Sequence, residues 1–224
     1  LVFHRGERLK VTNRNELQPH SFICGQESGY SDVTSTGDIE MIVVVFQPHA
    51  AKIFFHMPVT LLRDMNVAVA DIENPALRDL AHRVEDSANH DTSIELIEDY
   101  FYKCLMSGTP YHLPRLAEVV RHINNSTQTN IRALSNIACL SEKQFSRIFS
   151  ENIGTTPKDF MRIVRLQRTL SVMQHNQGIG FAQLSYECGY TDQSHMIKEF
   201  KLFSGYTPKE YIARYSPVSD YFTF

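Results

Sequence analysis

Hydrophobic and polar positions follow two different patterns, with short runs in the first part of the chain and a helical period in the rest. Residues 1–47 contain β-branched and aromatic runs separated by clusters of Asn, Gly, Asp and Ser, a pattern typical of short strands. These runs occupy residues 1–4, 21–25 and 39–46. The last run contains a continuous apolar stretch, Met41–Phe46, which predicts a buried strand because it is too short for a helix.

Helical periodicity begins after this strand-rich part. Residues 50–66 predict two short helical pieces that Pro58 separates. Apolar residues then recur at helical spacing through residues 75–105, which predicts two helices. Ser107–Pro110 is the best candidate for a linker, and from Pro114 the pattern is helical almost to the end.

The most informative pattern is a unit that occurs twice, at residues 134–160 and 184–211. From Phe145 onward the two copies match at a constant offset of 51 residues. Leu134 and Leu184 are offset by 50, so the second copy has one extra residue in its turn. A repeated short helix–turn–helix unit predicts two DNA-reading elements in one chain.

Each copy has the parts of a helix–turn–helix. A short helix at 131–138 or 181–188 precedes a tight turn, after which Ser141 or Thr191 is expected to cap the second helix. That second helix has two large apolar residues four positions apart, which predicts one buried face and one polar face. The apolar pairs are Phe145 with Phe149 and Met196 with Phe200.

Each copy then ends with a glycine and a new helix-start signal. Gly154 and Gly205 suit the positive φ that terminates many helices. Thr156 and Thr207 are each followed by Pro and, three residues later, by an acid. The segment Pro157–His175 predicts one long helix between the copies, which would hold two reading helices about 34 Å apart, the spacing of successive major-groove turns.

These motifs resemble the DNA-binding domain of the AraC/XylS family of bacterial transcription regulators. The strongest match is Cys188–Lys201 followed by Gly205–Pro208, which follows the family's signature in its second unit. Arg165–Arg168 resembles the Arg-Leu stretch of the family's linker helix. The resemblance spans residues 115–215 and implies sequence-specific binding at promoters and contact with RNA polymerase. The sequence has no Gly-rich phosphate loop, nucleophile elbow or paired-carboxylate constellation, so we expect neither enzymatic activity nor a cofactor.

The resemblance also implies which side chains contact DNA. Arg and Lys suit guanine and Gln suits adenine, while some of these side chains would contact phosphate alone. Two positions depart from the family pattern: Cys139 replaces a common turn glycine, and Ile197 replaces a polar residue and would touch a thymine methyl or rest on the duplex. The expected DNA-binding residues are Lys143, Ser146, Arg147, Arg165, Gln193, Ser194, His195 and Lys198.

The first half is similar to a sensor-type domain that is fused to the same DNA-binding module. The stretches Val43–His49 and Pro58–Asp64 carry this looser resemblance, which implies architecture and no defined ligand. Four residues could line an effector pocket, although an ordinary core stripe is the favoured alternative. They are Phe46, Phe54, Phe55 and Met57.

Charge is distributed unequally between the two halves. Residues 1–114 carry 9 Lys and Arg against 16 Asp and Glu, whereas residues 115–215 carry 13 against 8. The net charges of −7 and +5, with Asp220 in the tail, make up the −3 of the whole chain. This split predicts that the second half alone meets a polyanion.

The cysteines and histidines indicate neither a disulfide framework nor a metal site. The four cysteines are isolated, which favours small buried side chains in an intracellular protein. No His-x-His motif with a following glutamate supports a cupin-like metal site. No apolar run approaches the roughly 20 residues of a membrane span, and no signal peptide is visible.

The sequence therefore predicts an α+β protein with a β-rich N-terminal domain containing short helices and an all-α C-terminal domain of two helix–turn–helix units joined by a long helix. The expected boundaries are 1–106 for a sensor or association domain, 112–215 for the DNA-binding domain and 216–224 for a tail. The expected function is cytoplasmic transcription regulation through double-stranded DNA and RNA polymerase, with a small-molecule effector or a homodimer left open.

Two alternatives remain at this point. A DNA-repair methyl-transfer protein can carry the same DNA-binding module, but it needs a metal-bound reactive cysteine cluster. An interaction adaptor would keep the fold without binding DNA, which the basic residues in both reading helices disfavour.

Overall fold

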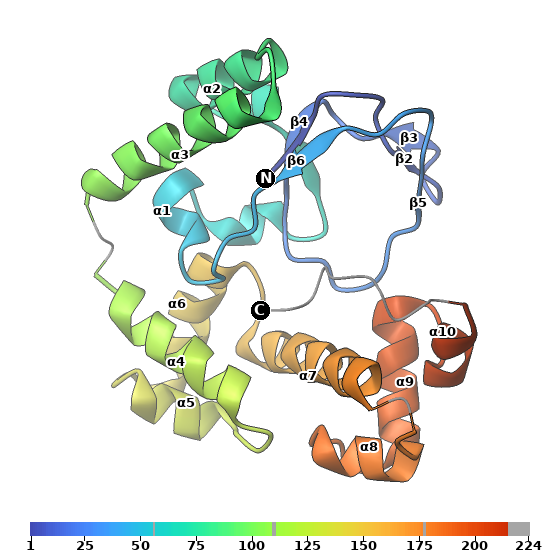
Figure 1. Ribbon diagram of the computed structural model, residues 1–224. Helices are drawn as coiled ribbons and strands as arrows, with labels where there is room; N and C mark the ends of the chain where they lie inside the picture. Colours follow the sequence, from blue (N-terminus) through green and yellow to red (C-terminus); the bar gives the residue numbers. More distant parts are fainter. Residues whose placement is uncertain (56, 109–110, 177, 215–224) are drawn as a thin grey trace. The chain divides into compact units, whose positions relative to one another are not determined.

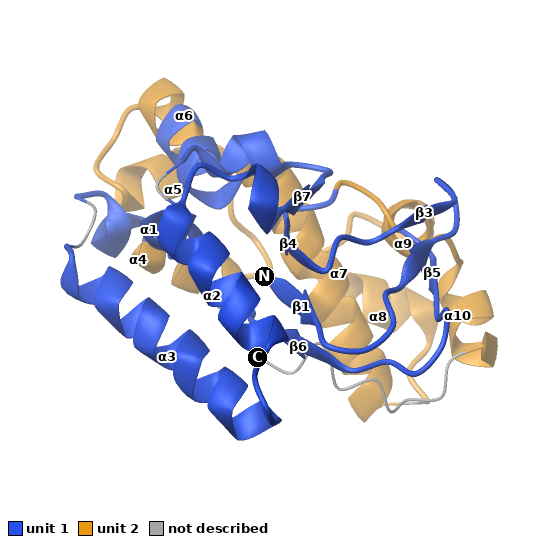
Figure 2. Ribbon diagram, turned by 90° about the horizontal axis from the view of Figure 1, so that it is seen from above, with its two compact units in different colours: residues 1–27, 31–116, 147–155 blue, residues 28–30, 117–146, 156–224 orange. Residues whose placement is uncertain are grey.

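The computed structural model describes residues 1–55, 57–108, 111–176 and 178–214. Its contacts divide the chain into two compact units, which Figure 2 colours separately. Unit 1 comprises residues 1–27, 31–116 and 147–155, and unit 2 comprises residues 28–30, 117–146 and 156 onward. Strands are confined to the first part of the described chain and helices make up most of the rest, so the predicted α+β fold is confirmed. The predicted boundaries at 106 and 112 stay a prediction, and the tail 216–224 and part of the Ser107–Pro110 linker lie outside the described residues.

Unit 1 contains two small antiparallel sheets. The larger one has the order β6-β1-β4-β7, and its register pairs Phe3 with Ile42 and Ile23 with Val67. The smaller one has the order β3-β2-β5. The strands are β1 (Val2–His4), β2 (Lys10–Val11), β3 (Glu16–Leu17), β4 (Ser21–Cys24), β5 (Val33–Thr34), β6 (Met41–Val43) and β7 (Asn66–Ala68).

The prediction of a buried strand over Met41–Phe46 is wrong in length and in burial. The strand ends at Val43, and Val43 and Val45 are 45% and 63% exposed. The physical reason is that side chains alternate between the two faces of a strand, and the face that carries Val43 and Val45 is exposed. The strand β6 also lies at the edge of the larger sheet.

The helices of unit 1 follow the predicted pattern. Two short pieces, α1 (Ala51–Phe55) and a 3₁₀ turn at Val59–Leu62, lie on either side of Pro58 as expected. They are followed by η2 (Val69–Asp71), α2 (Pro75–Glu85) and α3 (His90–Met106), and α2 and α3 lie side by side (Figure 1). Asn74 and Asn89 cap α2 and α3 with their side-chain oxygens, which fixes where each helix begins.

The C-terminal part is helical throughout its described length. Its helices are α4 (Leu113–Asn125), α5 (Ile131–Ile137), α6 (Glu142–Ile153), α7 (Pro157–His175), α8 (Phe181–Glu187), α9 (Gln193–Ser204) and α10 (Pro208–Arg214). The predicted long helix matches α7 at both ends. Thr156 and Thr207 accept hydrogen bonds from the N–H groups of Asp159 and Glu210, so both predicted helix starts are confirmed.

One predicted cap is wrong. Ser141 does cap α6, accepting a hydrogen bond from the N–H of Gln144 at 3.3 Å. In the second copy, however, Asp192 rather than Thr191 caps α9, accepting from the N–H of His195 at 2.7 Å. The offset of 51 residues pairs Ser141 with Asp192, whereas Leu140 and Tyr190 still match at 50. Thr191 is therefore the extra residue of the second copy.

Candidate nucleic-acid interface

The second helix–turn–helix has a well-defined core within unit 2. Met196 and Phe200 of α9 are fully buried against Leu184 and Cys188 of the preceding helix. Leu170 and Met173 complete the same cluster from α7, so α9 packs directly on the long helix. This packing fixes which face of α9 is left for solvent, as the four-residue spacing predicts.

The polar side of α9 carries the predicted reading residues. Gln193, Ser194 and Lys198 are exposed, and His195 is partly buried. Ile197 is also partly buried and packs against the core of this helix–turn–helix. The thymine contact expected for Ile197 stays a prediction.

The helix α6 repeats the division between buried and polar positions. Phe145 and Phe149 are fully buried, whereas Lys143 and Arg147 are exposed and Ser146 is partly buried. Arg147 lies 3.5 Å from Glu151, one turn further along the helix. An exposed pair of this kind contributes about 0–1 kcal/mol, so it leaves the guanidinium able to exchange partners.

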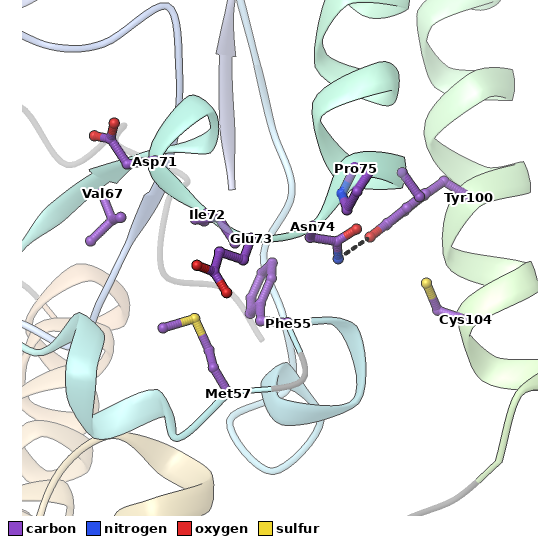
Figure 3. Close-up of a pocket in the computed structure, with 11 residues that line it drawn as sticks. Phe55, Met57, Val67, Asp71, Ile72, Glu73, Asn74, Pro75, Tyr100 and Cys104 are labelled. Atoms are coloured by element: carbon purple, nitrogen blue, oxygen red, sulfur yellow. Dashed lines mark hydrogen bonds between the residues drawn. The ribbon is translucent and has the colours of Figure 1, made fainter.

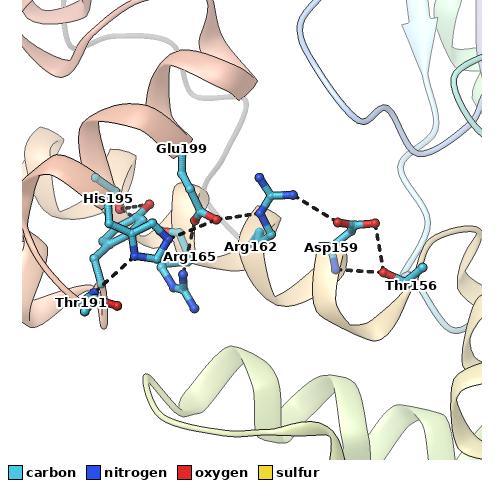
Figure 4. A network of polar contacts seen from close by, with 9 residues as sticks. Thr156, Asp159, Arg162, Arg165, Thr191, His195 and Glu199 are labelled. Carbon is cyan, nitrogen blue, oxygen red and sulfur yellow. Dashed lines mark hydrogen bonds and ion pairs between the residues drawn. The ribbon is translucent and has the colours of Figure 1, made fainter.

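A buried carboxylate joins α9 to α7 (Figure 4). Glu199, which is 8% exposed, accepts hydrogen bonds from Arg162 Nε at 2.6 Å and from Arg165 Nη1 at 3.3 Å. Its Oε1 also lies 3.4 Å from Nε2 of His195. Arg162 continues the network to Asp159 at 3.2 Å. Two of the predicted contact residues, Arg165 and His195, are thus held by an internal partner.

The ring of Tyr190 packs against two members of the same network. Arg165 lies over its ring at 5.1 Å, and the ring of His195 meets it edge-on at 5.5 Å. Burial raises the pKa of Tyr190 to about 12, so its hydroxyl stays neutral and bonds to Thr169 at 3.3 Å. These contacts orient the imidazole at the start of α9.

A basic cavity of about 530 Å³ opens beside this network, within unit 2. Its described lining includes Lys158, Arg162, Arg165 and His195, with Glu199 as the one acid among those residues. Lys158 is exposed and has no hydrogen-bond or ion-pair partner among residues 1–55, 57–108, 111–176 and 178–214. Thr129, another lining residue, has a buried hydroxyl without a hydrogen-bond partner in the described chain. The cavity has the chemistry to hold a phosphate group.

Arg168, the third arginine of α7, has a structural role that sequence reasoning missed. Its Nη2 donates to the carbonyl of Asn124 at 2.8 Å and to that of Ser126 at 3.2 Å, which closes the C-terminal end of α4. Burial lowers the pKa of this guanidinium. Sequence reasoning also missed Glu199, for which the available signal is its four-residue spacing from His195.

The turns of the two copies share an unusual backbone conformation. Cys139 has a φ of 53° and Gly189 has a φ of 78°. Both residues therefore adopt the left-handed region, which favours glycine. The first part of the turn thus has a left-handed residue at the same position in both copies, and the first copy accepts strain at Cys139.

The predicted effector residues separate into two groups in unit 1. Phe46 and Phe54 pack with Phe101 at ring distances of 4.8–5.3 Å and belong to the aromatic core. Phe55 and Met57 line a cavity of about 680 Å³ (Figure 3). Phe46 and Phe55 also line a smaller cavity of about 260 Å³, and their rings lie 5.3 Å apart. The effector role of all four residues stays a prediction.

No group of three or more His, Cys, Asp or Glu side chains with metal-binding geometry occurs among the described residues, which leave out His56. Cys24 and Cys139 are exposed, Cys104 is partly buried and Cys188 is buried. The matches to known regulators given next do not favour the methyl-transfer alternative. None of the described helices is both long and apolar enough to cross a bilayer.

Comparison with known protein families matches both parts of the chain. A family model described as a helix-turn-helix domain covers residues 134–214, and a domain of unknown function, DUF6597, covers residues 1–68. The chain is 33% identical over 82 residues to an HTH-type transcriptional regulator of Haemophilus influenzae, covering 37% of this chain and 27% of that protein. It is 25% identical over 175 residues to the regulator YbfI of Bacillus subtilis, covering 76% and 57%.

The chain thus spans about a quarter to just over half the length of these two relatives. Among solved structures, an AraC-type regulator from Chromobacterium violaceum matches with 22% identity and a TM-score of 0.43, over 48% of this chain and 95% of that one. ToxT from Vibrio cholerae matches with 14% identity and a TM-score of 0.47, over 94% and 87%. TM-scores below 0.5 are too low to carry an inference about function.

Proposed function

Because the chain belongs to the AraC family of helix-turn-helix transcription regulators, we propose that it binds double-stranded DNA in a sequence-specific way through α6 and α9. Each helix would enter one major-groove segment, so that a single chain reads two adjacent segments. We place this activity in residues 112–215 and a sensing or associating role in residues 1–106.

The observation that carries the proposal is the division of α9 into two faces. Met196 and Phe200 are fully buried, while Ser194 and Lys198 are exposed on the side that packing leaves open. A helix that enters a groove needs such a polar face on a firm base. The same division recurs in α6, where Lys143 and Arg147 are exposed.

The candidate contacts fall into two chemical roles. Arg147, Lys198 and Gln193 have side chains that can pair with guanine or adenine edges. Ser146, Ser194 and His195 are shorter or partly held, which suits backbone or water-mediated contacts. Arg165 is bonded to Glu199 and lines the basic cavity, where it would meet a phosphate together with Lys158.

Regulation would follow from the rest of the molecule. An effector bound in unit 1 would act by its differential affinity for DNA-competent and DNA-incompetent states. Activation would in addition require contact with RNA polymerase in the cytoplasm, and a homodimer would double the number of bases read.

The proposal is tested with the full chain and a duplex selected from a random pool. At fixed salt the selected duplex should bind about 10³-fold or more tightly than a scrambled duplex of the same composition. Lys198→Ala should reduce this ratio, whereas Arg83→Ala, which removes an exposed charge from unit 1, should leave it unchanged. Equal affinity of the intact protein for both duplexes would refute sequence-specific binding.

A further inference from the structure

The cavity of about 680 Å³ in unit 1 has the dimensions of a small-molecule site. It lies where the loop from η2 to α2 meets α1 and α3, and all of its lining residues belong to unit 1 (Figure 3). Phe55, Met57, Val67 and Ile72 supply an apolar surface. An open cavity of this size and composition can bury most of a small organic molecule.

The polar groups of this cavity have one sign of charge. Asp71 and Glu73 line it, and Lys, Arg and His are absent from its described lining. Both carboxylates are exposed, and neither has a hydrogen-bond or ion-pair partner in the described part of the chain. Figure 3 shows the Glu73 carboxylate turned toward Phe55 and Met57. An unpaired carboxylate next to an aromatic ring is a site for an ammonium group.

Asn74 and Tyr100 form another wall of the cavity, which is held by a hydrogen bond and carries no charge. The hydroxyl of Tyr100 accepts a hydrogen bond from the side-chain amide of Asn74 at 3.2 Å. Because burial raises the pKa of Tyr100 to about 12, this wall carries no negative charge near neutral pH. Cys104, one turn after Tyr100 on α3, places a thiol in the same wall.

We propose that this cavity binds a small organic amine, with its ammonium group at Glu73 and its apolar body on Phe55 and Met57, while Asp71 adds negative charge at the rim. Carboxylic acids of the same shape are excluded by charge repulsion. Binding here stands on the cavity alone, whereas any effect of the amine on DNA affinity rests on the proposed function.

The test uses the full chain without DNA and three probes of one shape: 4-phenylbutylamine, 4-phenylbutanol and 4-phenylbutyrate. Calorimetry should give at least a tenfold tighter dissociation constant for the amine than for the alcohol or the acid. Glu73→Gln should weaken amine binding about tenfold, which corresponds to about 1.4 kcal/mol. Glu98→Gln, the same change at an exposed site of α3 outside the cavity, should have no effect.

The cysteines give a second readout that locates the ligand. The amine should slow alkylation of Cys104 at least threefold and leave the exposed Cys24 and Cys139 unchanged, as read by mass spectrometry. Glu73→Ala repeats the charge test if Glu73→Gln fails to fold. Equal binding of amine and acid, full binding by a folded charge variant, or binding without protection of Cys104 would overturn the proposal. None of these outcomes bears on DNA binding.

Discussion

Glu199 and Arg162 form the shortest link between the second reading helix and the long helix that supports it. The Nε of Arg162 donates to Oε1 of Glu199 at 2.6 Å, and the exposed fractions of the two side chains are 27% and 11%. A pair so shielded from water is held in one geometry, and its partners are left unsatisfied when one member is removed. This link fixes the rotation of α9 about its own axis, and with it the direction of Lys198.

Glu199→Ala should therefore destabilise the protein by about 1–3 kcal/mol, because Arg162 and Arg165 lose a common acceptor in a partly buried place. Urea unfolding measures this loss. Glu187→Ala, at an exposed position of α8, is the matched control and should change stability by less than about 0.5 kcal/mol. Equal effects of the two substitutions would show that the network is not a structural anchor.

The left-handed turn residues give a pair of opposite predictions. Cys139→Gly should stabilise the protein by up to about 1 kcal/mol, since glycine removes the strain of φ 53°. Gly189→Ala should destabilise it by more than about 1 kcal/mol, because a Cβ there would lie 2.5 Å from the carbonyl oxygen of Thr127. Thermal unfolding of both variants measures whether each is more or less stable than the original protein. A loss of stability in Cys139→Gly would contradict the assigned strain.

The corrected helix cap can be tested at two neighbouring positions. Asp192→Ala should lower stability by about 1 kcal/mol, because it removes the acceptor for the first turn of α9. Thr191→Ala should be close to neutral, since its side chain caps nothing in the described structure. Chemical unfolding of the two variants shows which residue caps α9. A larger loss of stability in Thr191→Ala than in Asp192→Ala would favour Thr191 as the cap.

These cases show how far sequence reasoning reaches. Repetition predicted the helices α5, α6, α8 and α9, and cap signals predicted the limits of Pro157–His175, because caps and helix stops are local signals. It misplaced the cap at Thr191, since either Thr or Asp can serve there and only the register decides. Contacts between residues far apart in the sequence cannot be predicted from local patterns. Glu199, for example, bonds to Arg162, which lies 37 residues earlier.

The N-terminal half was less predictable for the same reason. The edge position of Met41–Val43 depends on which strand pairs with β1, and a single apolar run does not specify this. Phe46 and Phe55 are two aromatic residues on either side of a short segment, and the sequence does not distinguish their roles. Tertiary packing alone places Phe55, but not Phe46, at the cavity that Asp71 and Glu73 line.

The basic cavity predicts a contact without sequence preference. If Lys158 meets a backbone phosphate, Lys158→Ala should weaken binding to selected and scrambled duplexes by the same factor. The slope of log K against log salt should fall by about one unit. Titrations at several salt concentrations measure both quantities, with Arg83→Ala as the charge-matched control. A loss confined to the selected duplex would assign Lys158 to base reading instead.

The most direct test of the central claim is a single-base substitution scan of the selected duplex, measured with the intact protein and with Arg147→Ala and Lys198→Ala. The intact protein should show two blocks of sensitive base pairs, with centres about 10 base pairs apart and about 1–3 kcal/mol per mismatch. Arg147→Ala should remove the sensitivity to mismatches in one block of base pairs, and Lys198→Ala should remove it in the other. A single block, or loss of the same block in both variants, would contradict reading by two helices of one chain.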